Sequence, residues 1–304
     1  MIEVNGLTKR YGAVTAVRDL TFTVRPGHVT GFLGPNGAGK STTLRMILGL
    51  NRPTAGTATV HGRPFARRRA GLRHVGALLD AADVHGGRTA AAHLHALARS
   101  NGLSRRRTAE VLEEVGLAGA AHRRIGGFSL GMRQRLGIAA ALLGDPPVLL
   151  FDEPINGLDP EGVRWARGLF RRLAEEGRTV LVSSHLMSEM EHTADRLVVI
   201  GRGELIAEES LAVFAARGTG ASVTVRTPGA GELAHVLAAE GAEVRADGGD
   251  LLTVTGLGAA RVGELAHRHG IALHELAPRV ASLEQAFMEL TAGHSDYRAD
   301  GGGR

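Results

Sequence analysis

Residues 34–42 read GPNGAGKST and directly follow the apolar run HVTGFL at residues 28–33. The pattern G-x-x-x-x-G-K followed by Ser or Thr is that of a phosphate-binding loop, in which glycines let successive backbone N–H groups turn towards phosphate oxygens. An apolar strand pattern precedes the loop and a helical pattern follows it, and the N-terminal end of a helix attracts phosphate. The stretch therefore predicts a nucleotide site at a strand-to-helix turn of an α/β fold.

Lys40 is one of only two lysines, although Lys and Arg together number 36. A compact ammonium group can pass between phosphate oxygens, where the broad guanidinium of arginine would not fit. We therefore expect Lys40 to bind the β- and γ-phosphates of the nucleotide. The hydroxyl of Ser41 is expected to bind Mg²⁺, as this loop pattern implies.

The stretch VLLFDEP at Val148–Pro154 predicts a second part of the same site. Its four apolar residues indicate a buried strand, whose carboxyl end in a parallel sheet faces the ligand crevice. We expect Asp152 to hold Mg²⁺ through water, and Glu153 to polarise the attacking water as a general base. Alone, this run could simply be the end of a strand, but beside the phosphate loop it predicts a hydrolytic site.

Composition narrows the class of protein. A chain of 304 residues with 43% hydrophobic residues can form two domains, and the absence of cysteine excludes disulfides and thiolate metal sites. Aromatic residues make up only 4%, which disfavours stacking on nucleic acid. The apolar run Leu136–Gly144 is too short to cross a bilayer, and the N-terminus MIEVNGLTKRYG lacks the pattern of a signal peptide. We therefore expect a cytoplasmic chain that acts on membranes only through a partner.

The order of the expected elements divides the chain. Up to about residue 217, strands alternate with helices, which is typical of a parallel sheet with helices on both faces, and residues 82–143 are expected to form a helical subdomain. Residues 218–292 read β-α-β-β-α-β and then a helix, the order of a ferredoxin-like domain, and residues 293–304 are expected to be a disordered tail. Strands are expected, among other places, at residues 2–4, 20–24, 28–33, 57–60 and 271–276.

With these motifs, about residues 1–215 resemble the ATP-binding subunit of an ABC transporter. The family's signature L-S-G-G-Q-x-Q-R aligns with FSLGMRQR at Phe128–Arg135. NGLDP at Asn156–Pro160 matches the loop that crosses the family's dimer interface, and SSH ends at His185, which matches its switch histidine. The resemblance implies an α/β fold of the P-loop NTPase class: an ABC-type ATPase domain with a RecA-like core, an antiparallel β subdomain and a helical subdomain, followed by the small α+β ferredoxin-like domain.

The resemblance also implies a role for each site residue. ATP would be held by its own chain through Tyr11, stacked on adenine, and through Gly34, Pro35, Asn36, Gly37, Ala38, Gly39, Lys40, Ser41 and Thr42. Ser129 and Gly131 would contact the γ-phosphate of ATP bound to the opposite subunit, with Asp159 beside them across the interface. Glu153, His185 and Lys40 would be catalytic, and Ser41, Asp152 and Asp80 would be the Mg²⁺ ligands.

Because the signature lies far from its own phosphate loop, the implied partner is a second copy of the chain, in a head-to-tail dimer around two ATP. Hydrolysis would remove the bridging γ-phosphate and let the dimer open. An integral membrane permease would convert this movement into export, since the chain resembles the subgroup that serves drug, antibiotic or polysaccharide exporters. The chain would then lie at the inner face of the cell membrane, held there by the permease.

Three residues depart from the family pattern. Asp80 stands where the family usually has a glutamine near Mg²⁺, and the alternative is a solvated loop aspartate. Leu130 replaces the second glycine of the signature, so its side chain must point away from phosphate. Met132 replaces a glutamine and cannot donate a side-chain hydrogen bond.

A non-transport ABC ATPase acting on nucleic acid or the ribosome is the alternative function. DNA-repair members carry a long coiled coil between phosphate loop and signature, and the interval between residues 42 and 128 leaves no space for one. Ribosome-acting members carry two such modules, whereas GKST occurs once. An inactive ATPase is disfavoured because Lys40, Asp152 and Glu153 are all present. No nucleic-acid partner is therefore expected.

Overall fold

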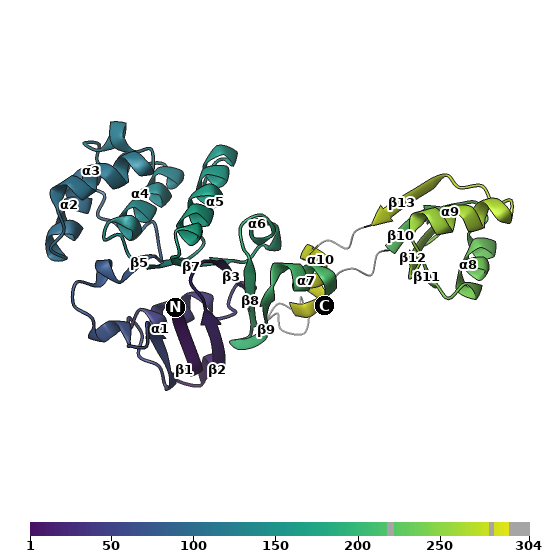
Figure 1. The fold of residues 1–304 in the computed structure, drawn as a ribbon, viewed down its shortest axis with the longest axis horizontal. Helices are drawn as coiled ribbons and strands as arrows, with labels where there is room; N and C mark the ends of the chain where they lie inside the picture. The colour runs from purple at the N-terminus through teal and green to yellow at the C-terminus, as the bar shows by residue number, and fades with distance from the viewer. Residues whose placement is uncertain (218–221, 280–282, 292–304) are drawn as a thin grey trace, which may run out of the picture. The chain divides into compact units, whose positions relative to one another are not determined.

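The computed structural model describes residues 1–217, 222–279 and 283–291. The chain divides into two compact units, one built from Met1–Leu211 and the other from Ala212–Leu290 (Figure 1). This division falls earlier than the domain boundary expected at residue 217, and the extent of the ATP-binding domain stays a prediction. The tail expected at residues 293–304 lies outside the described residues.

The first unit is built on a six-stranded sheet of β3 (Val29–Leu33), β5 (Val75–Leu78), β6 (Val148–Phe151), β7 (Thr179–Ser184), β8 (Arg196–Gly201) and β9 (Glu204–Ser210). Their order is β5-β6-β7-β3-β8-β9. Neighbours from β5 to β8 pair in parallel, and β9 pairs antiparallel with β8 at the edge. The central strands are apolar and buried along their whole length because both faces of the sheet are covered.

An antiparallel sheet of β1 (Ile2–Tyr11), β2 (Val14–Val24) and β4 (Ala55–Val60) adjoins this core, in the order β2-β1-β4. The strands are longer than those expected at residues 2–4, 20–24 and 57–60. Those bounds were wrong because irregularities of register between Val4 and Arg10 interrupt the alternation that marks a strand. The inner face of the sheet joins the main hydrophobic core, where the rings of Phe22 and Phe32 stack 5.5 Å apart.

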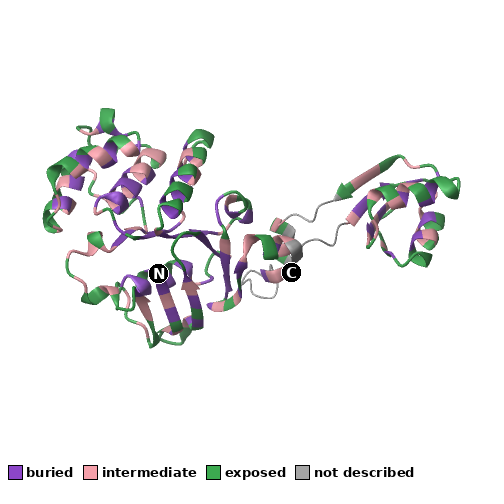
Figure 2. Cartoon of the chain, viewed as in Figure 1, coloured by how far each residue is buried: buried purple, intermediate pink, exposed green. Residues whose placement is uncertain are grey.

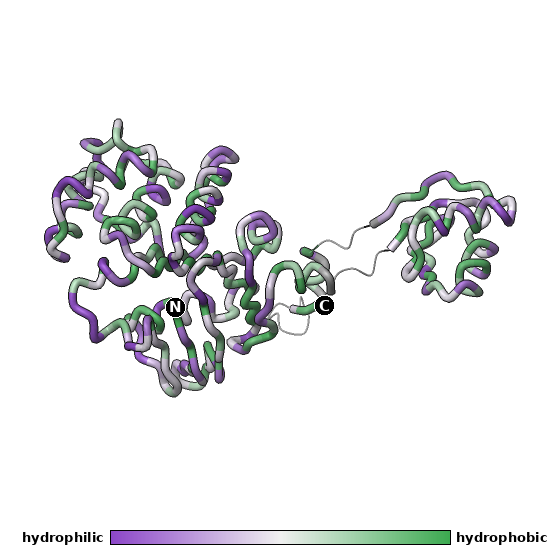
Figure 3. Tube along the Cα trace, viewed as in Figure 1, coloured by the Kyte–Doolittle hydropathy of each residue, from purple (hydrophilic) through white to green (hydrophobic). Residues whose placement is uncertain are grey.

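Helices and the antiparallel sheet cover opposite faces of the parallel sheet (Figure 1). α5 (Pro160–Glu175) packs on β7 and β3, and α6 (Met187–Glu191) packs on β7. α1 (Lys40–Ile47) lies with the antiparallel sheet and contributes Leu44 to the core. Buried and exposed residues alternate along α5 (Figure 2), as do its hydrophobic and hydrophilic residues (Figure 3), which is the pattern of an amphipathic helix with one face on the core.

A helical subdomain is formed by α2 (Ala90–Ser100), α3 (Arg105–Glu114) and α4 (Leu130–Leu142), which contact one another. Each helix begins after a hydroxyl N-cap that accepts a backbone hydrogen bond, which is why the chain turns into a helix at these points. Short 3₁₀ helices lie at Phe65–Arg67, Gly71–Arg73, Ala118–Ala120 and Ile125–Gly127. In the ranges that the structure describes, no helix combines the length and apolar character needed to span a bilayer.

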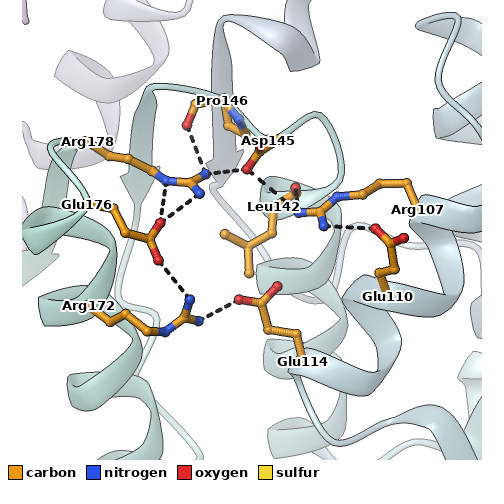
Figure 4. A network of polar contacts seen from close by, with 9 residues as sticks. All are labelled: Arg107, Glu110, Glu114, Leu142, Asp145, Pro146, Arg172, Glu176 and Arg178. Carbon is orange, nitrogen blue, oxygen red and sulfur yellow. Dashed lines mark hydrogen bonds and ion pairs between the residues drawn. The ribbon is translucent and has the colours of Figure 1, made fainter.

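Ion pairs join the helical subdomain to the core beside it (Figure 4). Arg172 on α5 contacts Glu114 at the end of α3 at 2.6 Å, and Glu176 at 3.0 Å. Arg178, just before β7, contacts Asp145 in the turn after α4 at 2.8 Å. These side chains are only partly buried, so each pair stabilises the fold little by itself and the network is sensitive to salt.

Replacing Arg172 by glutamate is expected to lower the free energy of unfolding by about 1 kcal/mol, because the new carboxylate would face Glu114 and Glu176. The loss should shrink in about 1 M salt, where the screening length is only about 3 Å. Urea unfolding at low and high salt measures the difference, and the double variant Glu114→Arg/Arg172→Glu should regain part of it. Equal stability of Arg172→Glu and the wild type at low salt would contradict a stabilising role for the network.

The second unit contains a four-stranded antiparallel sheet in the order β11-β12-β10-β13, with α8 and α9 packed on it. This order, together with the succession β-α-β-β-α-β, confirms the expected ferredoxin-like fold. Its hydrophobic core includes Val225, Leu237 and Leu265. The elements are α7 (Leu211–Arg217), β10 (Ser222–Arg226), α8 (Ala230–Ala239), β11 (Glu243–Ala246), β12 (Leu251–Thr255), α9 (Ala259–Arg268), β13 (Glu275–Arg279) and α10 (Leu283–Thr291).

The last strand of this sheet begins at Glu275 and not at residue 271 as expected. The N–H of Ile271 donates to the carbonyl oxygen of Ala266 at 2.9 Å, so this residue lies in the turn that caps the C-terminal end of α9. Pro278 lies within β13 and has no backbone N–H to donate. It is tolerated because β13 is an edge strand.

Candidate active site

The phosphate-binding loop lies between the end of β3 and the start of α1. Gly37 and Gly39 have φ angles of 83° and 98°, a left-handed conformation that favours glycine. A Cβ on Gly39 would also lie 2.6 Å from the carbonyl oxygen of Ala16. Residues 35–42 line a cavity of about 270 Å³ together with Ala16 and Glu153, so the loop forms most of its wall.

The side chain of Lys40 is held inside this loop, and only 7% of the residue is exposed. Its ammonium group donates to the carbonyl oxygens of Gly34 at 2.6 Å and Pro35 at 3.3 Å, and lies 3.6 Å from Oε1 of Glu153. Burial lowers the pKa of Lys40 from its ordinary value of 10.5, and the carboxylate of Glu153 opposes this shift in part. The cation of the loop is thus fixed in place by two carbonyl oxygens and a carboxylate.

Glu153 follows β6 with a φ of 48°, a left-handed conformation that is uncommon for any residue other than glycine. Its backbone N–H donates to Oγ of Ser183 at 3.0 Å. Its Oε2 accepts from Nδ2 of Asn156 at 3.3 Å and lies 3.0 Å from Nδ1 of His185. This turn places the carboxylate at the cavity, between Lys40 and His185.

Asp152 is buried directly after β6, and its Oδ1 accepts a 2.5 Å hydrogen bond from the hydroxyl of Ser183. The same hydroxyl accepts from the N–H of Glu153, so Ser183 links the two acidic residues. Sequence reasoning missed Ser183, because only His185 was singled out in the stretch SSH. The signal that could have found it is parallel pairing: β7 lies beside β6, which brings Ser183 level with Asp152.

Replacing Ser183 by alanine is expected to lower the free energy of unfolding by about 1–3 kcal/mol, because Asp152 and the Glu153 N–H both lose a partner. It should also lower kcat for nucleotide hydrolysis about tenfold or more, since misplaced reacting groups slow chemistry. Ser184→Ala is the matched control: its hydroxyl contacts Glu189, so it should lose stability but keep more of the rate. Thermal unfolding and steady-state kinetics measure both effects, and a wild-type kcat for Ser183→Ala would refute the predicted link to catalysis.

The signature residues begin α4 and do not line this cavity. Ser129 is the N-cap, and its hydroxyl accepts from the N–H of Met132 at 3.2 Å. Leu130, which replaces a glycine of the family pattern, is 53% exposed and so finds room at the surface. Gly131 packs against the backbone of Gly157 in the loop after β6, where an added Cβ would lie 3.2 Å from the Gly157 carbonyl oxygen.

Six other predicted residues also lie outside the lining of the cavity: Gly34, Asp152 and His185, described above, and Asp159, Tyr11 and Asp80. Asp159 caps α5, with Oδ1 accepting from the N–H of Gly162 at 2.8 Å. Tyr11 ends β1, is 48% exposed, and accepts a hydrogen bond at its hydroxyl from Nδ2 of Asn51 at 2.9 Å. Asp80 is exposed after β5, and its Oδ1 accepts from the N–H two residues further on at 2.7 Å.

The residues present fit a nucleoside triphosphate with Mg²⁺. The loop offers backbone N–H groups and one ammonium to anionic oxygens, and α1 adds the N-terminal end of a helix. The hydroxyl of Ser41 and the carboxylate of Asp152 are hard oxygen donors of the kind that Mg²⁺ prefers. Among the described residues, no group of three acidic or histidine side chains forms a metal site alone. An ion bound by few side chains and by phosphate oxygens is the usual arrangement for Mg²⁺.

Comparison with known proteins matches each unit to a family model. Residues 17–156 match the model described as ABC transporter. Residues 221–284 match a domain of unknown function, DUF8746. The ABC transporter match spans the phosphate loop, the signature and the two acidic residues after β6.

Curated and solved relatives agree with this match. The chain is 42% identical over 211 residues to a bacitracin transport ATP-binding protein of Bacillus licheniformis, which covers 68% of this chain and 69% of that protein. It is 36% identical over 209 residues to a lantibiotic transport ATP-binding protein of Streptococcus pyogenes, covering 69% and 90%. A solved bacterial ABC transporter cassette, determined as a dimer, has a TM-score of 0.63 at 25% identity and covers 69% of this chain and 99% of that one.

Proposed function

Because this chain belongs to the family of ABC transporter ATP-binding subunits, we propose that it closes around two ATP as a head-to-tail dimer and drives export through a separate membrane permease. As a member of this family, the chain binds and hydrolyses ATP. The observation that carries the proposal is the convergence of Lys40 and Glu153, 3.6 Å apart, on one cavity. Lys40 would then bind the γ-phosphate, and Glu153 would take the proton of the water that attacks it.

Each residue around the cavity has a distinct role in ATP hydrolysis. The loop and Lys40 hold the phosphates, and Glu153 accepts the proton of the attacking water. His185, 3.0 Å from the Glu153 carboxylate, keeps that carboxylate oriented. Ser41 and Asp152 would hold Mg²⁺, which neutralises charge on the phosphate oxygens.

Asp80 is the remaining residue that we propose as a Mg²⁺ ligand. It follows Leu78, which pairs with Phe151, so it lies at the same sheet edge as Asp152. Its Oδ1 is engaged by a backbone N–H of its own loop. The loop would therefore have to rearrange before this carboxylate could reach the ion.

The partner that completes the site is a second copy of the chain. Ser129 caps α4 and Asp159 caps α5, and neither they nor Gly131 line their own cavity; in this proposal all three serve the cavity of the opposite chain. The exposed side chain of Leu130 beside them offers apolar surface for that contact. The similar cassette that was solved as a dimer supports this assembly.

The exported substrate is, in this proposal, an antibiotic peptide or another hydrophobic compound. Bacitracin and lantibiotic transport are the activities in the names of the two relatives described above. The permease forms the path through the membrane, and this chain lies against it at the inner face of the membrane.

Tyr11 stacks on the adenine of the ATP that drives the transport cycle.

Export is tested by identifying the genes adjacent to that of this chain, where we expect one that encodes a multi-span membrane protein, and by expressing the two proteins together. Cells with both proteins should tolerate more bacitracin or lantibiotic than cells in which the chain carries Glu153→Gln. Purification of the chain from detergent-solubilised membranes should recover that membrane protein. Recovery of ribosomal proteins or nucleic acid in its place would overturn the proposal and favour a non-transport ATPase.

A further inference from the structure

Gln134 is a buried polar residue of α4, with only 7% of its surface exposed. Its Nε2 donates to two backbone carbonyl oxygens, that of Glu153 at 3.3 Å and that of Asn156 at 3.2 Å. Both acceptors lie in the loop that follows β6. One side-chain amide therefore connects the helix that begins after Ser129 to the loop that carries the general base.

The side-chain amide of Gln134 supports the backbone conformation of Glu153 by donating to its carbonyl oxygen. With a φ of 48°, its peptide groups turn away from the directions they would have in a continued β6. The N–H is taken by Ser183, and the carbonyl oxygen accepts from Gln134 and, at 3.3 Å, from the N–H of Asn156. A partly buried carbonyl oxygen that loses one of its two donors destabilises the conformation that those donors support. Gln134 thus favours the left-handed turn that places the carboxylate at the cavity.

Arg135, the next residue, holds α4 through different contacts. Its Nη1 donates to the carbonyl oxygen of Val115 at 3.0 Å, and its guanidinium carbon lies 4.3 Å from the centre of the Trp165 ring. These contacts reach α5 and the end of α3, and neither reaches the carbonyl of Glu153. Two adjacent residues of one helix therefore have separable roles, anchoring of the helix by Arg135 and support of Glu153 by Gln134.

We propose that Gln134 is a positioning residue for ATP hydrolysis, which acts by holding the backbone of Glu153 so that its carboxylate stays beside Lys40. This inference rests on the proposed role of Glu153 as general base. Gln134 does not line the cavity itself. Its loss should therefore change the rate of the chemical step and leave ATP binding in place, which is the kinetic pattern of an interaction needed in the transition state.

The test compares three variants of the full-length chain. Gln134→Met removes the donor at nearly unchanged length, and Gln134→Glu keeps the shape but replaces the donating amide by an acceptor. For both, we expect kcat to fall about tenfold or more while KM for ATP changes less than about twofold, because small displacements of a reacting group act on kcat. Arg135→Met is the matched control: it also removes a bond from α4 to a backbone carbonyl, and its kcat should fall much less.

Thermal unfolding of each variant shows which of them are folded. A wild-type kcat in folded Gln134→Met or Gln134→Glu would overturn the proposal, and so would an equal fall of kcat in Arg135→Met. If Gln134→Met does not fold, the kcat of Gln134→Glu is compared with those of the wild type and Arg135→Met, and the same outcomes support or overturn the proposal. A failure of the proposed function is distinguishable, because Glu153→Gln would then hydrolyse ATP at the wild-type rate whatever the Gln134 variants do.

Discussion

Replacing Glu153 by glutamine is expected to lower the rate of ATP hydrolysis about a thousandfold, which lies within the range for loss of a general base. Glutamine has nearly the same shape, so the turn after β6 and its contacts can persist, but an amide cannot accept the proton of the attacking water. The change also removes a negative charge 3.6 Å from Lys40, so ATP binding should be kept or strengthened. Phosphate release and ATP binding, measured on the same preparation, test both parts.

The matched control is Glu175→Gln. Glu175 is an exposed residue of α5 outside the lining of the cavity, so this variant should hydrolyse ATP as fast as the wild type. The comparison separates loss of the base from loss of one negative charge on the chain. If Glu153→Gln were as fast as Glu175→Gln, Glu153 would not be the general base.

Replacing Lys40 by arginine is expected to lower ATP hydrolysis about a hundredfold, although the positive charge is kept. The ammonium group lies within hydrogen-bond distance of two carbonyl oxygens and near Glu153, in a place that is 7% exposed. The planar fork of a guanidinium is too broad for this space and would displace the loop or point out of it. Binding and kinetic measurements with ATP should show both a larger Kd and a lower kcat.

The only other lysine of the chain provides the control. Lys9→Arg makes the same chemical change away from the phosphate loop, in β1, where the lysine donates to the carbonyl oxygen of Arg52. Its effect on Kd and kcat should be small. A Lys40→Arg chain that binds and hydrolyses ATP like Lys9→Arg would refute the role of a compact ammonium in the loop.

Much of the fold could be predicted from local patterns. The apolar runs of β3, β6 and β7 are buried from end to end, and the succession of elements in residues 218–292 was enough to predict the ferredoxin-like fold. The bounds of β1 and β13 could not be predicted. The length of β1 depends on bulges that arise from pairing with distant strands, and the start of β13 depends on the turn that ends α9.

In the candidate site, too, some residues could be predicted from local motifs and others could not. Lys40, Asp152 and Glu153 were predicted because each stands in a short motif whose chemistry is evident from the residues. Ser183 and Gln134 were missed, because their contacts are hydrogen bonds to residues far away in the sequence: the backbone of Glu153 and, for Ser183, also the carboxylate of Asp152. The bonds of Ser183 follow from the parallel pairing of β6 with β7. The bond from Gln134 goes to the carbonyl oxygen of Glu153, whose left-handed φ no pattern around that residue reveals.

The mass of the Glu153→Gln chain in solution tests most directly whether the phosphate loop is half of a site that a second copy completes. Light scattering on the purified chain should give the monomer mass of 31.8 kDa without nucleotide, and twice that mass with ATP and Mg²⁺. The substitution prevents hydrolysis from separating the two chains while the measurement is made. A mass that stays at 31.8 kDa under ATP concentrations that saturate binding would contradict the shared site.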